Sequence, residues 1–239
     1  MILRIGIDKG TDGALGPIFD NRSFEYIPLS EKNVNTREEK TFGNTKGRSG
    51  VYLSKYLPDN IKNRKLHLDP EFETFTYGDQ TVKRNYLLKL KEGDFLVFYV
   101  GLTPYNTTVQ EEGLYIIGYF QVESVVDFNN IDTTQKRTSC NIYKNNAHIK
   151  SAGLKDLVII KGRKETSKLL DKAFLISKKK INKIGRKYHA VSPEVEDLLG
   201  ISGSIQRSIP PRFITADHME NLMKMLNFTF NAQIYQKIQ

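Results

Sequence analysis

Two apolar segments decide the fold of this chain: KEGDFLVFYV (residues 91–100) and GLYIIGYFQV (residues 113–122). Both are rich in β-branched and aromatic residues, and a polar linker separates them. The turn Gly93-Asp94 leads into the first segment, and Gly118 lies in the middle of the second. The pattern predicts two strands of a buried sheet, with another group lying close to the backbone at Gly118.

Further strands are expected on both sides of this pair. Alternating or apolar runs predict strands at residues 2–7, 24–29 and 157–161, and a short strand or a turn at residues 51–56. Residues 31–50 are polar and turn-rich, which is typical of a long surface loop, and such loops often carry function.

The last third of the chain has a helical character. Four apolar residues at helical spacing predict a helix over residues 165–174. Ser192 followed by Pro193 predicts the start of a second helix that ends near Gly200. A third helix is expected over residues 215–226.

These elements predict an α+β protein. Residues 1–162 would form a β-rich body, and residues 163–239 a basic, more helical part packed on that body as one domain. With 39% hydrophobic residues, the chain can bury a core of this kind.

The positive charge is concentrated near the C-terminus. The chain has a net charge of +9, and residues 151–239 hold 16 bases against 8 acids. Residues 172–187 alone hold seven bases and no acid. Such a local field attracts polyanions and releases their counterions. The pattern therefore predicts a nucleic acid or nucleotide partner, and the alternative is a solvated basic face.

Other features restrict the class of protein. No apolar run approaches the roughly 18 residues of a membrane span, and the first ten residues do not have the pattern of a signal peptide. The single cysteine, Cys140, fits a reducing compartment. A cytoplasmic protein without a membrane partner is expected. Spacings such as Cys-x-x-Cys or His-Glu-x-x-His are absent, so the sequence predicts no metal site and identifies no cofactor. The oligomeric state stays open.

Acids, bases and aromatic residues gather in two further segments. Residues 68–79, LDPEFETFTYGD, contain three aromatic and four acidic residues just before Lys83 and Arg84. Carboxylates in such a setting can bind a metal, position a substrate or simply pair with bases, and the aromatic rings can stack on nucleobases. Residues 203–212 form a Gly/Ser/Pro loop whose arginines could grip phosphate.

Taken in order, several blocks resemble the nucleotide modification-associated domain family of the third type over roughly residues 2–214. The blocks are IGIDKG (5–10), FEYIP (24–28), LDPEF (68–72), TYGD (76–79), GDFLVFY (93–99), GSIQR (203–207) and PPR (210–212). The resemblance implies an association with systems that modify bases in DNA, and it implies no particular reaction. Residues 91–99 and 113–122 also resemble the small β-barrel of PUA-like domains (ASCH, EVE and YTH relatives), several of which hold a modified or flipped base.

The first functional hypothesis is a nucleic-acid- or nucleotide-binding protein associated with base modification. A base would lie in a β-barrel pocket lined by Tyr77, Tyr99, Tyr119, Lys9, Lys83 and Arg84. Phosphates would be held by Lys178, Lys179, Lys180, Lys183, Arg186, Lys187, Gln206, Arg207 and Arg212.

Two alternatives stay open. One is an enzyme acting on a nucleotide or modified base, with Asp8, Asp69 and Asp79 as catalytic or Mg²⁺-binding carboxylates. The other is a protein-interaction module whose basic face docks an acidic partner.

Overall fold

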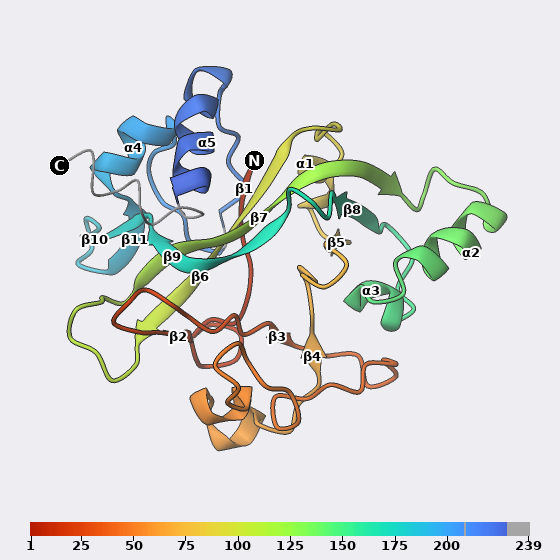
Figure 1. The fold of residues 1–239 in the computed structure, drawn as a ribbon, viewed down its shortest axis with the longest axis horizontal. Helices are drawn as coiled ribbons and strands as arrows, with labels where there is room; N and C mark the ends of the chain where they lie inside the picture. The colour runs from red at the N-terminus through yellow and green to blue at the C-terminus, as the bar shows by residue number, and fades with distance from the viewer. Residues whose placement is uncertain (208, 229–239) are drawn as a thin grey trace.

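The computed structural model describes residues 1–207 and 209–228 and is built around one long antiparallel hairpin (Figure 1). Its strands are β6 (Phe95–Pro104) and β7 (Gly113–Asp127). These are the two strands predicted from the apolar segments, so that prediction is confirmed. In β7, a β-carbon at Gly118 would lie 2.6 Å from the carbonyl oxygen of Lys168. The group close to this glycine is therefore a neighbouring part of the chain itself.

Both edges of the hairpin are extended by further strands. β1 (Ile2–Arg4) and β2 (Gly16–Ile18) follow one another along β6, both parallel to it. Along the other edge of β7 lie β9 (Lys168–Leu175) and then β8 (Val158–Gly162), and β5 (Thr76–Asp79) pairs with β8. In the described part of the chain these seven strands form one curled, half-barrel sheet.

The helix predicted over residues 165–174 is wrong, because this segment forms strand β9. Leu169 packs in the core on one face of the sheet, and Leu170 and Phe174 pack in the core on the other face. A strand with apolar residues on both faces has no strict alternation, and its spacing can imitate a helix. The unpaired edge of β7 decides the outcome, since it offers β9 a ladder of backbone hydrogen bonds.

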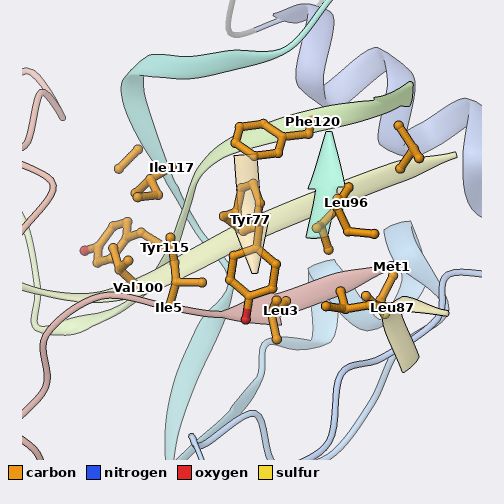
Figure 2. Close-up of a cluster of buried hydrophobic side chains, with 14 of the residues drawn as sticks. Met1, Leu3, Ile5, Tyr77, Leu87, Leu96, Val100, Tyr115, Ile117 and Phe120 are labelled. Atoms are coloured by element: carbon orange, nitrogen blue, oxygen red, sulfur yellow. The ribbon is translucent and has the colours of Figure 1, made fainter. Parts of the chain in front are cut away.

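Alternate residues of the central hairpin supply two hydrophobic cores. Leu96 and Phe120 lie in the first core, together with Tyr77 (Figure 2). Val97 and Tyr99 lie in the second core, on the other face of the sheet. This second core is covered by α4 (Pro193–Leu199) and α5 (Met219–Phe228).

The two C-terminal helices lie in the segments where the sequence predicts them. The Ser192 hydroxyl caps α4 by accepting a hydrogen bond from the Val195 N–H, and Gly200 ends the helix with φ 63°. A 3-10 turn (Ala216–His218) leads into α5. The helices predicted from Ser192 and over residues 215–226 are thus confirmed.

The segment between β2 and β5 forms a separate layer at one end of the sheet, shown in orange in Figure 1. It contains a small sheet of β3 (Leu29–Ser30) and β4 (Leu66–His67), and two 3-10 helices (Leu53–Tyr56 and Asp59–Ile61). The strand predicted at residues 24–29 is therefore wrong over most of its length. Its backbone bonds in turn to β2 and to the segment after β1, so no continuous ladder forms.

Three short helices and one hairpin complete the described chain. The helices are α1 (Arg84–Leu87), α2 (Thr133–Ile142) and α3 (Ala147–Lys150). The hairpin is formed by β10 (Ser177–Ile181) and β11 (Lys187–Val191). The α+β class with a β-rich body is confirmed. The division at residue 162 stays a prediction, and its C-terminal part extends beyond the described residues.

Each helix in the described part of the chain is too short or too polar to pass through a bilayer.

Candidate functional site

An open pocket of about 590 Å³ lies beside the end of β1. Three distant parts of the chain line it: the segment that follows β1, the start of β7 and the stretch from β11 onward. We call it the arginine pocket, and its charged or polar lining residues are Arg4, Asp8, Lys9, Thr11, Glu112, His189, Gln206 and Arg207.

A glycine turn directs the Asp8 carboxylate into this pocket. Gly6 has φ 70°, a left-handed conformation that ends β1, and a β-carbon there would lie 3.1 Å from the Ile27 carbonyl oxygen. Asp8 Oδ1 then accepts hydrogen bonds from the N–H groups of Gly10 (2.7 Å) and Thr11 (3.0 Å). The turn thus fixes the carboxylate, and its own N–H groups are already engaged.

Two guanidinium groups converge on Asp8. Arg207 Nε donates to Asp8 Oδ2, and its terminal nitrogen donates to the Gly6 carbonyl oxygen. The terminal nitrogen of Arg4 lies 3.8 Å from the same carboxylate oxygen. Burial alone would raise the pKa of Asp8, but Arg207 and Arg4 outweigh it and lower the pKa.

Arg4 lacks a full set of partners. Its Nε is buried and bonds to no group of the described residues. Burial lowers the pKa of Arg4, and the nearby charge of Arg207 lowers it further. Because arginine stays charged in proteins, two guanidinium groups facing one carboxylate leave a surplus of positive charge in the pocket.

The rim of the pocket carries more ionisable groups. Lys9 Nζ bonds both carboxylate oxygens of Glu112, at 2.9 and 2.8 Å. His189 Nδ1 lies 3.1 Å from the Ser177 hydroxyl. Burial lowers the pKa of His189, and the charge of Lys179 lowers it further. The imidazole is therefore neutral near pH 7 in the free protein.

The register of the β10–β11 hairpin divides the predicted basic stretch between two faces. Lys179 pairs with His189, and Lys187 lies two residues before His189, so both lysines share the face that lines the pocket. Lys178 and Lys180 point to the opposite face, where Lys180 Nζ lies 3.9 Å from a carboxylate oxygen of Glu196. Lys183 and Arg186 lie in the exposed turn between the strands.

A group of buried charges lies beneath the pocket. Lys83 Nζ is 3.4 Å from the Arg4 carbonyl oxygen. Burial lowers the pKa of Lys83, and the charges of Asp79, Arg207, Asp69 and Arg4 all act on it as well. Lys83, Asp69 and Asp79 are thus neighbours of the arginine pocket.

Each of the two buried aspartates has its own partners. Asp79 accepts hydrogen bonds from the Tyr77 hydroxyl (3.2 Å) and from Thr81 N–H (2.6 Å). Asp69 accepts one from the Gly78 N–H (2.8 Å). Burial, followed by the charge of Asp79, raises the pKa of Tyr77 well above its usual value.

The three tyrosines expected to line a base pocket lie apart. Tyr77 is in the core of one face of the sheet, and Tyr99 and Tyr119 are in the core of the other face. The Tyr99 hydroxyl donates to the Ile205 carbonyl oxygen at 3.1 Å. These side chains therefore do not line one pocket in this structure.

Two of the predicted arginines also lie outside the arginine pocket. Arg84 forms an ion pair with Asp127 at 2.9 Å. Arg212 pairs through its backbone with Ile2 and donates to the Ser204 carbonyl oxygen at 3.3 Å. Of the predicted site residues, the structure brings Asp8, Lys9, Gln206 and Arg207 together in the pocket.

Sequence reasoning missed Arg4 as a site residue. Its one signal is its position as the single charged residue within an otherwise apolar first strand. It also missed His67 and His148, which lie beside Asp69. Neither histidine belongs to a recognisable sequence motif, because the contacts among them arise only in the folded chain.

Comparison with known proteins gives one result. The family model described as nucleotide modification associated domain 3 matches residues 1–192. No curated protein and no solved structure matches the chain. The relation to PUA-like barrels accordingly stays a prediction. The matched range covers most of the chain, including the segment from Arg4 to Thr11 and the β10–β11 hairpin, and ends before Arg207. The chain therefore belongs to the nucleotide modification associated domain 3 family.

Proposed function

We propose that this protein binds a nucleotide unit of a nucleic acid, with a phosphate group held in the arginine pocket. The observation that carries the proposal is the convergence of Arg4 and Arg207 on the single carboxylate of Asp8. Guanidinium groups match the geometry of phosphate oxygens, and the surplus charge favours an anion. The pocket volume of about 590 Å³ is in the range of sites for small ligands and nucleotides.

The hairpin beside the pocket favours a nucleic acid over a free nucleotide. Lys179 and Lys187 lie on the pocket side of β10 and β11, and Lys183 and Arg186 continue the positive charge into the turn. A row of bases next to a phosphate site can hold the following phosphates of a strand. The family description, which refers to nucleotide modification, agrees with such a ligand.

A second pocket, near Glu25 and Arg48, is less suited to an anion. It has a volume of about 300 Å³. The Glu25 carboxylate accepts hydrogen bonds from the N–H groups of Arg48 and Ser49, and the Arg48 side chain pairs with Asp171 at 2.6 Å. Both charged side chains are thus already engaged by other groups of the chain.

An enzyme that uses Asp8, Asp69 and Asp79 is the second candidate. A general acid at neutral pH needs a carboxyl group with a raised pKa, and the pKa of Asp8 is lowered. The lowered pKa of Asp8 therefore argues against a role as general acid. Product formation from a nucleotide substrate would favour the enzyme, and indifference to nucleic acid would favour the protein-docking alternative. A cytoplasmic location stays part of the proposal.

Fluorescence anisotropy with labelled single- and double-stranded DNA and RNA, over a salt series, tests the proposal. We expect the binding affinity to fall as the salt concentration rises. Arg4→Gln or Arg207→Gln should each reduce the affinity by about 10-fold to 100-fold, which is the range for a hydrogen bond to a charged group. Arg84→Gln is the matched control, because it removes an arginine from an ion pair outside the pocket. Absence of binding at about 50 mM salt, or an equal loss in the Arg84 variant, would overturn the proposal.

A further inference from the structure

Two histidines and one aspartate meet on the side of the molecule away from the β10–β11 hairpin (Figure 1). His67 is in β4, Asp69 follows it, and His148 is in α3; Figure 1 shows β4, β5 and α3 on the same side. Each residue offers one atom that can bind a metal, and these three atoms lie within 4.8 Å of one another. His148 Nε2 is 3.4 Å from Asp69 Oδ2, and the two imidazole rings are 4.9 Å apart at 86°. We call these three residues the His–Asp–His triad.

The surroundings of His148 fix the tautomer of its ring. Gln80 Nε2 donates to the carbonyl oxygens of Gly153 (2.8 Å) and Lys155 (2.9 Å). Gln80 Oε1 therefore faces His148 Nδ1, at 3.0 Å, and an amide oxygen can only accept. Nδ1 must carry the hydrogen, so the neutral ring presents the Nε2 lone pair to Asp69.

The surroundings of His67 have the same effect. His67 Nδ1 lies 2.8 Å from Glu31 Oε2, which also accepts from the Ser151 hydroxyl at 2.8 Å. The other carboxylate oxygen, Glu31 Oε1, accepts from the Asn33 N–H at 2.8 Å. An ionised carboxylate only accepts, so Nδ1 of His67 carries the hydrogen and Nε2 is left with its lone pair. Orientation of a histidine by a carboxylate or amide oxygen is typical of metal ligands.

The third member of the triad is oriented as well. Asp69 Oδ1 accepts from the Gly78 N–H (2.8 Å) and from Asn146 Nδ2 (3.3 Å), while Oδ2 faces His148. Asn146 also caps α3, because its side-chain oxygen accepts from the His148 N–H. A β-carbon at Gly78 would lie 2.7 Å from His148 Cδ2, so glycine makes room for this ring.

We propose that the His–Asp–His triad binds one divalent first-row transition metal ion, of the zinc or iron(II) class. The ligand atoms are Nε2 of both histidines and Oδ2 of Asp69. Ligands about 2.0–2.1 Å from a tetrahedral metal lie about 3.3 Å from one another, and the His148–Asp69 pair already has this spacing. Two nitrogens and one oxygen suit these metals, and three protein ligands leave coordination positions open. His67, Asp69 and His148 are not lining residues of the arginine pocket.

Cobalt(II) titration of the full chain, followed by visible absorption, tests the site, and calorimetry with Zn²⁺ gives the stoichiometry. We expect one ion per chain. His67→Gln and His148→Gln should each weaken binding at least 100-fold, and Gln80→Leu, which removes an orienting oxygen, by about 10-fold to 100-fold. His218→Gln is the matched control, since His218 pairs with Thr215 outside the triad.

The outcomes separate the metal site from a simple ion pair. A histidine–aspartate ion pair without metal would show no uptake of Co²⁺ or Zn²⁺, and this result would overturn the proposal. Uptake that survives in both His67→Gln and His148→Gln would also overturn it. Should these variants fold poorly, the thermal melting of the Gln80→Leu variant replaces them. Zn²⁺ should raise the melting temperature of this variant less than that of the unaltered protein, and an equal rise would overturn the proposal. Arg207→Gln should bind the metal normally, so failure of nucleotide binding leaves this test unaffected.

Discussion

At the scale of single residues, Asp8 holds two guanidinium groups together. Its side chain is 10% exposed, and each of its carboxylate oxygens has a partner. Removal of its charge leaves Arg4 and Arg207 facing one another without a counter-charge. In the proposed function, the carboxylate stabilises the folded pocket and the two arginines bind the anion.

We expect Asp8→Asn to lower the free energy of unfolding by about 2–3 kcal/mol near pH 7, as for lost hydrogen bonds to a charged group. Because the pKa of Asp8 is lowered in the folded protein, its carboxylate stabilises the fold fully at pH values above the ordinary carboxyl pKa of 3.8. This stabilisation is lost as the pH falls below 3.8. Urea denaturation of both proteins near neutral pH and near pH 3 measures this. An unchanged difference at the lower pH would contradict the assignment.

His189 predicts how ligand binding depends on pH. Its pKa lies below 6.5 in the free protein, and a bound phosphate favours the imidazolium and raises this pKa. Linkage then strengthens binding as the pH falls through this range. Anisotropy with a phosphodiester oligonucleotide measures it, because a phosphomonoester changes charge in the same range. In the His189→Gln variant the increase in binding affinity at lower pH should vanish. If the variant and the unaltered protein gave the same pH profile of affinity, His189 would be excluded from the site.

At the scale of secondary-structure elements, the β10–β11 hairpin offers a matched comparison. Lys179→Glu with Lys187→Glu changes the face that carries His189, and Lys178→Glu with Lys180→Glu changes the opposite face by the same charge. We expect the first pair to weaken nucleic acid binding more and to reduce the salt dependence by about two phosphate contacts. Equal effects of the two pairs, measured by anisotropy over a salt series, would show that only net charge matters.

Elements were predictable from sequence where their signals are local. The Ser192 cap and the Gly200 terminus of α4 depend on a few neighbouring residues, and both are observed. Strand β9 has apolar residues at helical spacing because they serve two cores, and its partner β7 is far away in the sequence. Local propensity cannot report a pairing of this kind.

The candidate site was predictable only in part for the same reason. Asp8 and Arg207 each occur in a recognisable block, but 199 residues separate them, and only the folded chain shows that they pair. The common pocket of Tyr77, Tyr99 and Tyr119 was inferred from residue type alone. Which face of a strand a tyrosine occupies depends on register, and register places Tyr77 in a different core from the other two.

At the scale of the whole molecule, the arginine pocket depends on both ends of the described chain. Ile2 pairs through its backbone with Arg212, and Arg207 bonds the segment that follows β1. The family model ends at residue 192, before Arg207 and before α4 and α5. The matched range alone therefore lacks one side of the pocket.

We expect a chain that ends at residue 192 to lose nucleotide binding and to aggregate. The loss of α4 and α5 would expose the second core, including Val97 and Ile116, as a large apolar patch. Size-exclusion chromatography and dye binding to exposed apolar surface measure this. Arg207→Gln is the control, because it changes the pocket and leaves that core intact. A monomeric, well-folded truncated chain would contradict the expectation.

The central hairpin has a consequence for how the protein melts. Phe98 and Tyr99 are adjacent in β6 but belong to different cores, and β7 is paired along both of its edges. Neither core can come apart without disturbing the strands that hold the other. Calorimetry should therefore record a single cooperative transition with equal van't Hoff and calorimetric enthalpies. The body and the basic C-terminal part would then lose their structure at one temperature, as a single thermodynamic unit.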